Sequence, residues 1–340
     1  PTARTYLGAA EVNGKIYAIG GFTDLNNTEE YDPTTDTWTI KAAMPTPRFG
    51  FAIVVYQSKI YCMGGLTGRG WPFASSVTGA IEVYDPTTNA WEIKKPMPTA
   101  RAHLEACVIN DQIYVIGGRT GGPNSAVSTN QIYDPTSEIW ETKKPMPYPV
   151  ASFSSTVVGN KIYVLGGQDD SDGPKNLDVT QIYDSTTDSW SIGTPMPTTV
   201  LNSAACTVSD PLGYEDIYLI GGKLGALEAG GNRTDMVQVL NTENHTWSVG
   251  VSILTAHDGL AVAVVNNTIY AMGGAGGNIL SSGEGSAVNE AYTITPSPTP
   301  TVNHSPHTPQ TFPVLFIALI LLAVVITSFL LFRKHQKSSK

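Results

Sequence analysis

Residues 131–167, QIYDPTSEIWETKKPMPYPVASFSSTVVGNKIYVLGG, contain the pattern from which the architecture follows. Three short runs rich in β-branched and aromatic residues end here at Tyr133, Val158 and Leu165. Trp140 marks a fourth run between the first two. Each run has the length and composition of a strand, and the breaks, such as Gly159-Asn160, have turn chemistry. The stretch therefore predicts a small antiparallel β-meander.

Imperfect copies of this stretch extend over residues 1–294. A double glycine recurs at spacings of 44, 53, 49, 55 and 52 residues. The six pairs are Gly20-Gly21, Gly64-Gly65, Gly117-Gly118, Gly166-Gly167, Gly221-Gly222 and Gly273-Gly274. The repeated tryptophans are Trp38, Trp91, Trp140, Trp190 and Trp247. A period of about fifty residues with four short strands per repeat is typical of a β-propeller, whose blades bury their faces against each other.

Further motifs recur with the double glycine. They are a tyrosine before an Asp-Pro turn, as at Tyr84 and Tyr133, a tryptophan six or seven residues later, and a Met-Pro-Thr link, as at residues 97–99. On these motifs residues 1–294 resemble the kelch-repeat family. The resemblance implies an all-β, six-bladed kelch-type propeller in which the repeated Gly, Tyr and Trp residues are architectural. Double glycines suit crowded turns because glycine adopts positive φ without a Cβ penalty.

The sixth repeat has no tryptophan and no fourth strand, since it supplies only runs at 260–265, 268–272 and 289–294. Propellers avoid an exposed edge when the two chain ends share one blade. Residues 1–4, Pro-Thr-Ala-Arg, match the link at residues 98–101. We therefore expect a sixth blade of three strands, and we interpret the chain as a fragment whose missing strand precedes Pro1.

The C-terminal part has a different composition. Residues 295–311 are rich in Pro, Thr and Ser, which favours an extended, semi-rigid stalk. Residues 312–332 carry no charge and are long enough for a transmembrane helix. The tail at 333–340 is basic, and the positive-inside rule then places it in the cytoplasm. The sequence predicts a single-pass cell-membrane protein with an extracellular propeller, and this C-terminal part resembles that of archaeal and some bacterial surface proteins.

Composition excludes some partners. The formal net charge is −9, and no Lys/Arg stripe with interleaved aromatic residues is present, so nucleic acid is disfavoured as a partner. Cys62, Cys107 and Cys206 fall in different predicted blades without C-x-x-C spacing. They indicate small buried side chains rather than a disulfide framework or a zinc site. The sequence implies no cofactor and no metal.

One face of the predicted propeller, called the loop face here, carries the connections from second to third strands and from fourth to first strands. The opposite turn face carries tight turns such as Asn13-Gly14, and the stalk leaves from it, so the loop face is distal to the membrane. The variable loops lie on the loop face, at residues 22–27, 66–80, 119–129, 168–179, 223–235 and 275–288. Such loops on a rigid scaffold usually carry binding residues. Trp71, outside the repeat pattern, is a candidate contact.

Arginines end the first three links between predicted blades, at Arg4, Arg48 and Arg101, and His257 ends the last. Some kelch domains bind peptides or small acidic ligands at the channel mouth. By resemblance to these, the four residues and His103 are candidate ligands for carboxylates. The alternative is structural, with each arginine capping its own blade or pairing with a loop carboxylate.

Catalytic signals are weak, and no catalytic residue is assigned. A kelch-type copper radical oxidase needs a Tyr, Cys and two-His site, which the isolated His103, His245 and His257 do not supply. The acids at 169–172 lack calcium-loop spacing and predict a solvated loop.

The sequence favours a cell-surface binding module whose membrane-distal loop face recognises a protein, peptide or glycan. The alternative is a membrane-anchored extracellular enzyme acting on a carbohydrate or sugar acid, which a clustered Arg, His and acid pocket would favour. An aromatic loop surface around Trp71 would favour the binding module. An intracellular ubiquitin-ligase adaptor, the role of many kelch proteins, conflicts with the predicted membrane span.

Overall fold

The computed structural model describes residues 2–22, 26–68, 75–122, 124–171, 173–209, 213–225, 232–276 and 285–293. Trp71 and residues 294–340, which include the predicted stalk, membrane helix and tail, lie outside these ranges. Within the described ranges no helix is long and apolar enough to cross a membrane. The regular elements of the described residues are β-strands.

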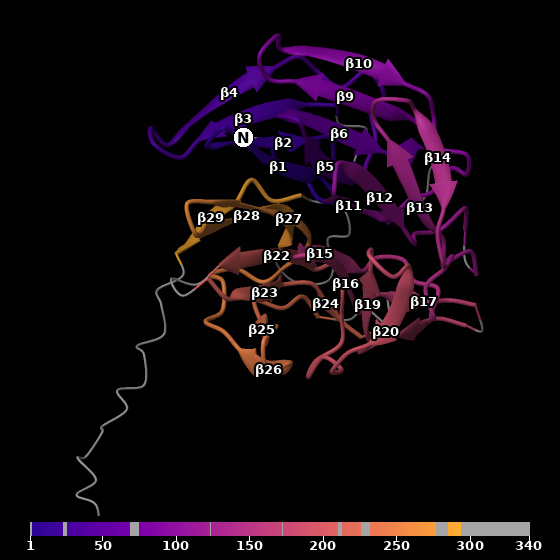
Figure 1. The fold of residues 1–340 in the computed structure, drawn as a ribbon. Coiled ribbons are helices and arrows are strands. Elements are labelled where there is room, and N and C mark those ends of the chain that lie inside the picture. Colours follow the sequence, from indigo (N-terminus) through magenta and orange to yellow (C-terminus); the bar gives the residue numbers. More distant parts are fainter. Residues whose placement is uncertain are drawn as a thin grey trace, which may run out of the picture. The chain divides into compact units, whose positions relative to one another are not determined.

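Six antiparallel sheets form the blades of a propeller, as the repeats predict (Figure 1). Blade one contains β1 (Gly8–Val12), β2 (Lys15–Ile19), β3 (Thr28–Asp32) and β4 (Thr37–Lys41). Blade two contains β5 (Ala52–Tyr56), β6 (Lys59–Met63), β9 (Ile81–Asp85) and β10 (Ala90–Lys94). Blade three contains β11 (Glu105–Ile109), β12 (Gln112–Ile116), β13 (Asn130–Asp134) and β14 (Ile139–Thr142).

The second half of the propeller repeats the plan. Blade four contains β15 (Ser154–Val158), β16 (Lys161–Leu165), β19 (Thr180–Asp184) and β20 (Ser189–Ile192). Blade five contains β22 (Ala204–Ser209), β23 (Glu215–Ile220), β25 (Val237–Asn241) and β26 (Thr246–Val249). Three short pairs lie in the loops: β7 (Leu66–Gly68) with β8 (Ser75–Val77), β17 (Gln168–Asp169) with β18 (Lys175–Asn176), and β21 (Val200–Leu201) with β24 (Lys223–Leu224).

Blade six has three strands among the described residues, which confirms the expectation. They are β27 (His257–Val265), β28 (Thr268–Gly276) and β29 (Asn289–Thr293). The first two are longer than predicted, because link residue Asp258 pairs with Ala275 beyond Gly259. Gly259 faces Gly274 in an unbroken register, and both glycines have positive φ, 64° and 86°, which they adopt without a Cβ penalty.

The innermost strands β1, β5, β11, β15, β22 and β27 contact one another in a closed cycle (Figure 1). Between each pair of neighbouring blades lies one apolar cluster, such as Met63, Ile81, Leu104 and Ile113 between blades two and three. Stability therefore depends on blade-to-blade burial, as expected for repeats that cannot bury their faces alone. The three cysteines are free and buried in this core, as predicted.

The repeated aromatic residues join the outer strands of each blade. Tyr84 on β9 and Trp91 on β10 lie with ring centroids 5.2 Å apart. The Trp91 indole N–H donates to the Ala42 carbonyl of the link before the blade, at 2.8 Å. Trp190 and Trp247 make the corresponding bonds in blades four and five. The indole thus ties the outermost strand to the neighbouring blade.

The double glycines lie where two connections cross. A Cβ at Gly64 would lie 2.4 Å from the Arg101 carbonyl oxygen, and Gly64 has a φ of 71°. In the same region the blade links pair with the loops that follow the double glycines, as Phe49 does with Leu66 and Ala102 with Arg119. Both kinds of connection therefore share one face, which confirms the predicted loop face.

Candidate binding site at the channel mouth

A ring of backbone hydrogen bonds surrounds the channel at the loop face. Each N–H donates to the carbonyl of the equivalent residue in the preceding blade, at 2.7–3.1 Å, and the six bonds close on themselves. All six residues have left-handed backbones with φ between 51 and 64°. The members of this backbone ring are Tyr6, Gly50, His103, Ser152, Asn202 and Gly259. Four of them are not glycine, and such conformations concentrate at functional sites.

Three side chains of the backbone ring meet over the mouth of the channel. The rings of Tyr6 and His103 pack edge to face with centroids 5.6 Å apart. The Asn202 amide donates to the Tyr6 hydroxyl at 3.1 Å. Gly50 and Gly259 make room for these side chains, since a Cβ would lie 3.0 Å from the His103 imidazole and 3.1 Å from the Tyr6 ring, respectively.

The groups over the mouth carry no charge at neutral pH. Burial, with a smaller contribution from the nearby Arg119, lowers the pKa of His103 to about 4. Burial, reinforced by Asp258, raises the pKa of Tyr6 above its ordinary value. Removing a group from water disfavours its charged form, and this accounts for both directions.

Two ion pairs flank this neutral centre. Arg233 Nε lies 2.6 Å from Asp258 Oδ1, next to ring residue Gly259. Arg119 Nη2 lies 3.8 Å from Asp170 Oδ2, and 3.4 Å from the side-chain oxygen of Gln168. The arginine side chains are more exposed, at 17% and 13%, than their aspartate partners, at 5% and 9%. Each pair therefore exposes more of its arginine than of its aspartate at the mouth.

Asp170 is an anchor rather than a solvated loop residue, which corrects the interpretation of residues 169–172 for this acid. Its two carboxylate oxygens accept hydrogen bonds from the backbone N–H groups of Asn124 and Ala126, at 3.1 and 2.8 Å. Asp170 thus fixes the blade-three loop beside Arg119. No cluster of three His, Cys, Asp or Glu side chains suited to a metal occurs in the part of the chain that the structure describes.

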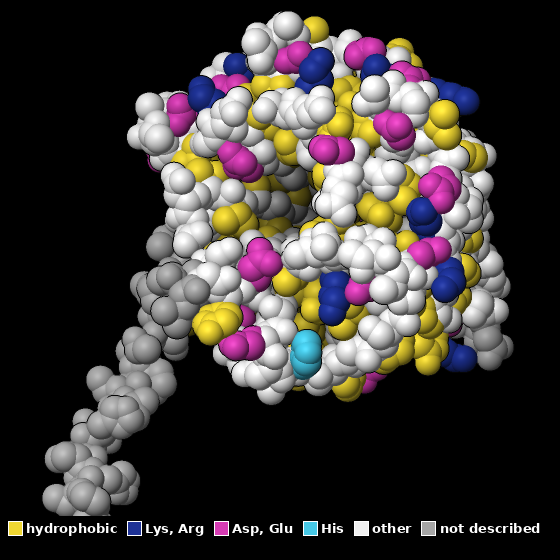
Figure 2. Space-filling model, in the orientation of Figure 1, with side chains coloured by type: hydrophobic (Ala, Val, Ile, Leu, Met, Phe, Trp, Pro, Cys, Tyr) yellow, Lys and Arg dark blue, Asp and Glu magenta, His cyan; other side chains and the backbone are white. Residues whose placement is uncertain are grey.

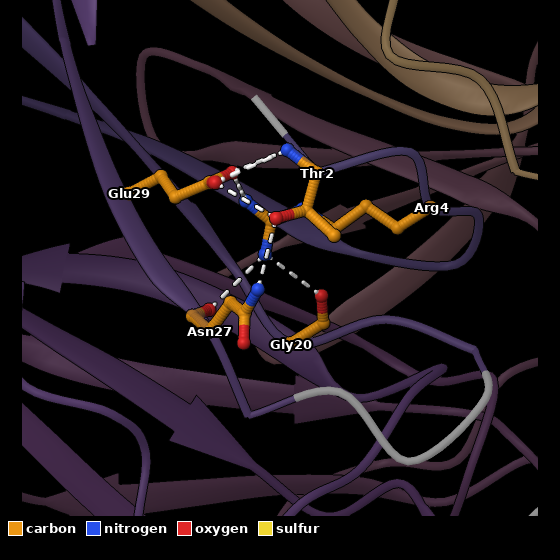
Figure 3. Close-up of polar contacts among 5 residues, drawn as sticks. All are labelled: Thr2, Arg4, Gly20, Asn27 and Glu29. Atoms are coloured by element: carbon orange, nitrogen blue, oxygen red, sulfur yellow. Dashed lines mark hydrogen bonds and ion pairs between the residues drawn. The ribbon is translucent and has the colours of Figure 1, made fainter. Parts of the chain in front are cut away.

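The three link arginines lie inside the blades rather than at the mouth. Arg4 pairs with Glu29 on β3 and donates to the carbonyls of Gly20 and Asn27, each at 3.1 Å (Figure 3). Glu29 also accepts a hydrogen bond from the Thr2 backbone N–H at 3.1 Å (Figure 3). The Arg4 side chain is 2% exposed, so its guanidinium serves the blade.

Arg48 and Arg101 repeat this arrangement. Arg48 pairs with Glu82 on β9 and donates to the Cys62 carbonyl at 2.9 Å. Arg101 donates to the Gly117 carbonyl at 2.7 Å and to the Gln131 side-chain oxygen at 2.9 Å. Both arginines are fully buried. Of the two interpretations that the sequence allowed for these arginines, the structure agrees with the structural one, in which each arginine caps its own blade.

The other two predicted contacts have mixed outcomes. His103 lies in the backbone ring, and its role as a ligand contact stays a prediction. His257 is buried at the base of β27, and neither of its ring nitrogens has a hydrogen-bond partner among the described residues. The sequence did not point to Arg119, although the signal was present: Arg119 directly follows a double glycine that turns the chain toward the mouth.

A family model described as the KLHDC2/KLHL20/DRC7 Kelch-repeats domain matches residues 1–167 and 50–274. The chain belongs to the kelch-repeat family. Kelch propellers commonly mediate protein interactions, and a binding module is consistent with this family. The kelch resemblance inferred from the repeats is confirmed.

Individual kelch relatives match only part of the chain. Beta-scruin of Limulus polyphemus is 34% identical over 122 residues, which are 34% of this chain and 13% of that protein. Kelch-like protein 36 of Bos taurus is 33% identical over 112 residues, 32% of this chain and 18% of that protein. The matches thus span less than a fifth of each relative.

The solved structure of YjhT is similar in fold. It superimposes with a TM-score of 0.73 at 17% sequence identity, covering 86% of this chain and 96% of that one. At this identity the likeness concerns the propeller alone.

Proposed function

We propose that this kelch propeller is a binding module that recognises an acidic group of a protein, peptide or glycan at the channel mouth on the loop face. The observation that carries the proposal is the placement of Arg119 and Arg233 beside the backbone ring. Arginine binds carboxylates through two parallel hydrogen bonds, which gives both strength and orientation.

Arg119 has capacity for such a ligand. Its contacts to Asp170 and Gln168, at 3.8 and 3.4 Å, are long for charge-assisted hydrogen bonds, whose usual length is about 2.8 Å. Each carboxylate oxygen of Asp170 also accepts a hydrogen bond from a backbone N–H, so Asp170 is not available to Arg119 alone. An incoming carboxylate at the mouth would therefore improve the hydrogen bonding of this guanidinium.

The test is binding of the 340-residue chain to an array of acidic peptides and glycans, followed by affinity measurement on each hit. Arg119→Gln and Arg233→Gln should each weaken binding about tenfold or more, the loss of one hydrogen bond to a charged group. Lys161→Gln, which removes an exposed charge at the turn face, should leave the affinity unchanged. Hits that bind the two arginine variants as tightly as the parent would refute the proposed site.

We further propose that the module is displayed at the cell surface, with residues 312–332 spanning the membrane. The support is the sequence alone: 21 uncharged residues followed by a basic tail. Protease treatment of intact cells expressing the chain should degrade the propeller while a C-terminal tag stays protected. A propeller that is protected in intact cells would contradict this location.

A further inference from the structure

The layer of the channel wall just inside the backbone ring contains one charged residue. The layer consists of one residue from each innermost strand. Each of these residues pairs with the residue of the second strand that precedes a double glycine, as Glu105 pairs with Ile116 and Ala52 pairs with Met63. The six residues are Gly8, Ala52, Glu105, Ser154, Ala204 and Ala261. Five are small, so the long side chain of Glu105 stands in space that its neighbours leave empty.

Glu105 lines two consecutive empty spaces of the channel. The one next to the backbone ring has a volume of about 440 Å³, and its wall includes Leu7, Phe51, Ser203 and Leu260. The other, of about 630 Å³, is also bounded by Ser155 and by small apolar residues of the innermost strands. Figure 2 shows the centre of the blade ring hollowed, with hydrophobic side chains on the wall of the hollow.

The Glu105 carboxyl has no hydrogen-bond or ion-pair partner among the described residues. The same position in the blade-four strand, Ser154, does have partners, since its hydroxyl bonds to the hydroxyl and carbonyl of Ser203 at 2.8 and 2.9 Å. Burial alone raises the pKa of Glu105 to about 8. The Glu105 side chain is half-buried and borders the space of the channel, so a ligand there can reach its carboxyl, and a structural role would not require an unpaired carboxyl at this place.

The wall chemistry distinguishes between kinds of cation. A bound calcium or magnesium ion needs several oxygen ligands around it, and zinc needs about four N, O or S ligands. The described residues offer no group of three metal-binding side chains, and Glu105 shares its surroundings with the polar Tyr6, His103 and Asn202 as well as with Leu, Phe, Ala and Ser. A single carboxylate beside hydroxyls and a few apolar side chains suits a small organic cation, whose head forms the ion pair while its short stem packs on the apolar side chains.

We propose that the channel of this propeller binds a small primary ammonium compound with a short apolar stem, whose ammonium group pairs with the Glu105 carboxylate. The hydroxyls of Ser155 and Ser203 lie in the same wall and accept the remaining ammonium N–H groups. Leu7, Phe51 and Leu260 bury the stem. The ligand enters from the turn face, because Tyr6, His103 and Asn202 meet over the loop-face mouth.

The test uses n-propylammonium chloride and the 340-residue chain at pH 9, where the carboxyl is ionised and the ammonium is still protonated. Isothermal titration calorimetry should detect saturable binding, and Glu105→Gln should weaken it at least tenfold. n-Propanol, which has a similar stem but no charge, should bind at least tenfold more weakly than the ammonium. Equal affinity of the Gln variant, or equal affinity for propanol, would overturn the proposal.

Two further measurements keep the result decisive. Binding by the parent chain should weaken about tenfold for each pH unit below 8, because the carboxyl takes up a proton; a pH-independent affinity would contradict the assignment. The pH dependence is measured on the parent chain, so it tests the proposal even if the Glu105→Gln variant does not fold. Lys161→Gln, the turn-face control, should leave ammonium binding unchanged.

Discussion

Each link between blades has a structural partner, the Glu or Gln at the second position of a third strand. The second residue of each third strand is Glu or Gln, and its side-chain oxygen accepts a backbone N–H of the link in blades one, two, four and five. Where the link ends in Arg4 or Arg48, this partner is Glu29 or Glu82. Where the link ends in Val150, the partner is the uncharged Gln181. In these three blades the charges of the two positions match, whereas in blade three Arg101 donates to the uncharged Gln131.

The sequence showed the arginines but not this coupling, because the partners are more than twenty residues apart and each looks unremarkable alone. The Glu or Gln repeat at 29, 82, 131, 181, 238 and 290 was available as a signal. His103 was noticed because it lies in the link itself, and its role as a ligand contact stays a prediction. Arg119 and Glu105 were not found, since each occupies a position where the other repeats carry a different residue type.

Removing the buried Arg48 should be far more harmful than removing the whole ion pair. Arg48→Val leaves Glu82 as an uncompensated buried charge, and we expect the free energy of unfolding to fall by about 3–5 kcal/mol. The double variant Arg48→Val with Glu82→Gln reproduces the pair of blade four, so it should recover at least half of that loss. Urea unfolding of the parent, both single variants and the double variant measures the coupling. A double variant as unstable as Arg48→Val would contradict the structural role.

The strands are the part of the fold that periodicity predicts best. Each apolar run in residues 131–167 became a strand, because tight turns separate runs that alternate between two buried faces. The strand ends of blade six were misjudged, since the pairing of Asp258 with Ala275 depends on a loop contact and not on local composition. Asp170 was misjudged for the same reason, as its partners come from the neighbouring blade.

Among the described residues, no fourth strand pairs with the outer edge of blade six. In the other blades an apolar link residue is buried, and in blades one, two and four it lies against the first glycine of the pair; the buried residues are Met44, Met97, Met146, Met196 and Ile253. At the corresponding place beside Gly273 there is an empty space of about 220 Å³, lined also by Leu7, Trp38 and Met272. The β29 edge and the space beside Gly273 lie where one more strand and its apolar link residue would pack.

Supplying that strand should stabilise the propeller. Fusing a copy of residues 88–97, the fourth strand and link of blade two, directly before Pro1 places a methionine next to the space. Burying one Met and part of one Trp contributes about 3 kcal/mol, which raises Tm by about 5 °C or more in a domain of this size. The matched control carries Ala in place of the added Trp and Met. An equal Tm for the two fusions would show that the added strand does not dock as described.

The whole molecule combines a symmetric scaffold with an asymmetric channel. Hydrogen bonds of the backbone ring and the six apolar clusters repeat around the axis, and of these the repeats predicted the burial between blades. The chemistry lies where the symmetry is broken: one glutamate among small residues, two ion pairs at the mouth, and aromatic side chains beside glycines. A repeat analysis averages over such differences, so the candidate site could be placed on a face but not resolved into residues.

Because the channel forms only when all six blades close, its two shifted groups should give the assembled propeller a characteristic dependence of stability on pH. The pKa of Glu105 is raised from 4.5 to about 8, so its contribution is full below pH 4.5 and is lost as the pH rises to about 8. The pKa of His103 is lowered from 6.5 to about 4, so its contribution is full above pH 6.5 and is lost as the pH falls to about 4. The free energy of unfolding changes by at most about 1.4 kcal/mol per pH unit for each group.

Thermal unfolding between pH 3.5 and 9.5 measures both effects. Glu105→Gln should reduce the loss of stability at alkaline pH, and His103→Gln should reduce the loss of stability at acid pH. Profiles that run parallel to that of the parent chain would show that these groups stay in contact with water, and would remove the physical basis for a selective channel.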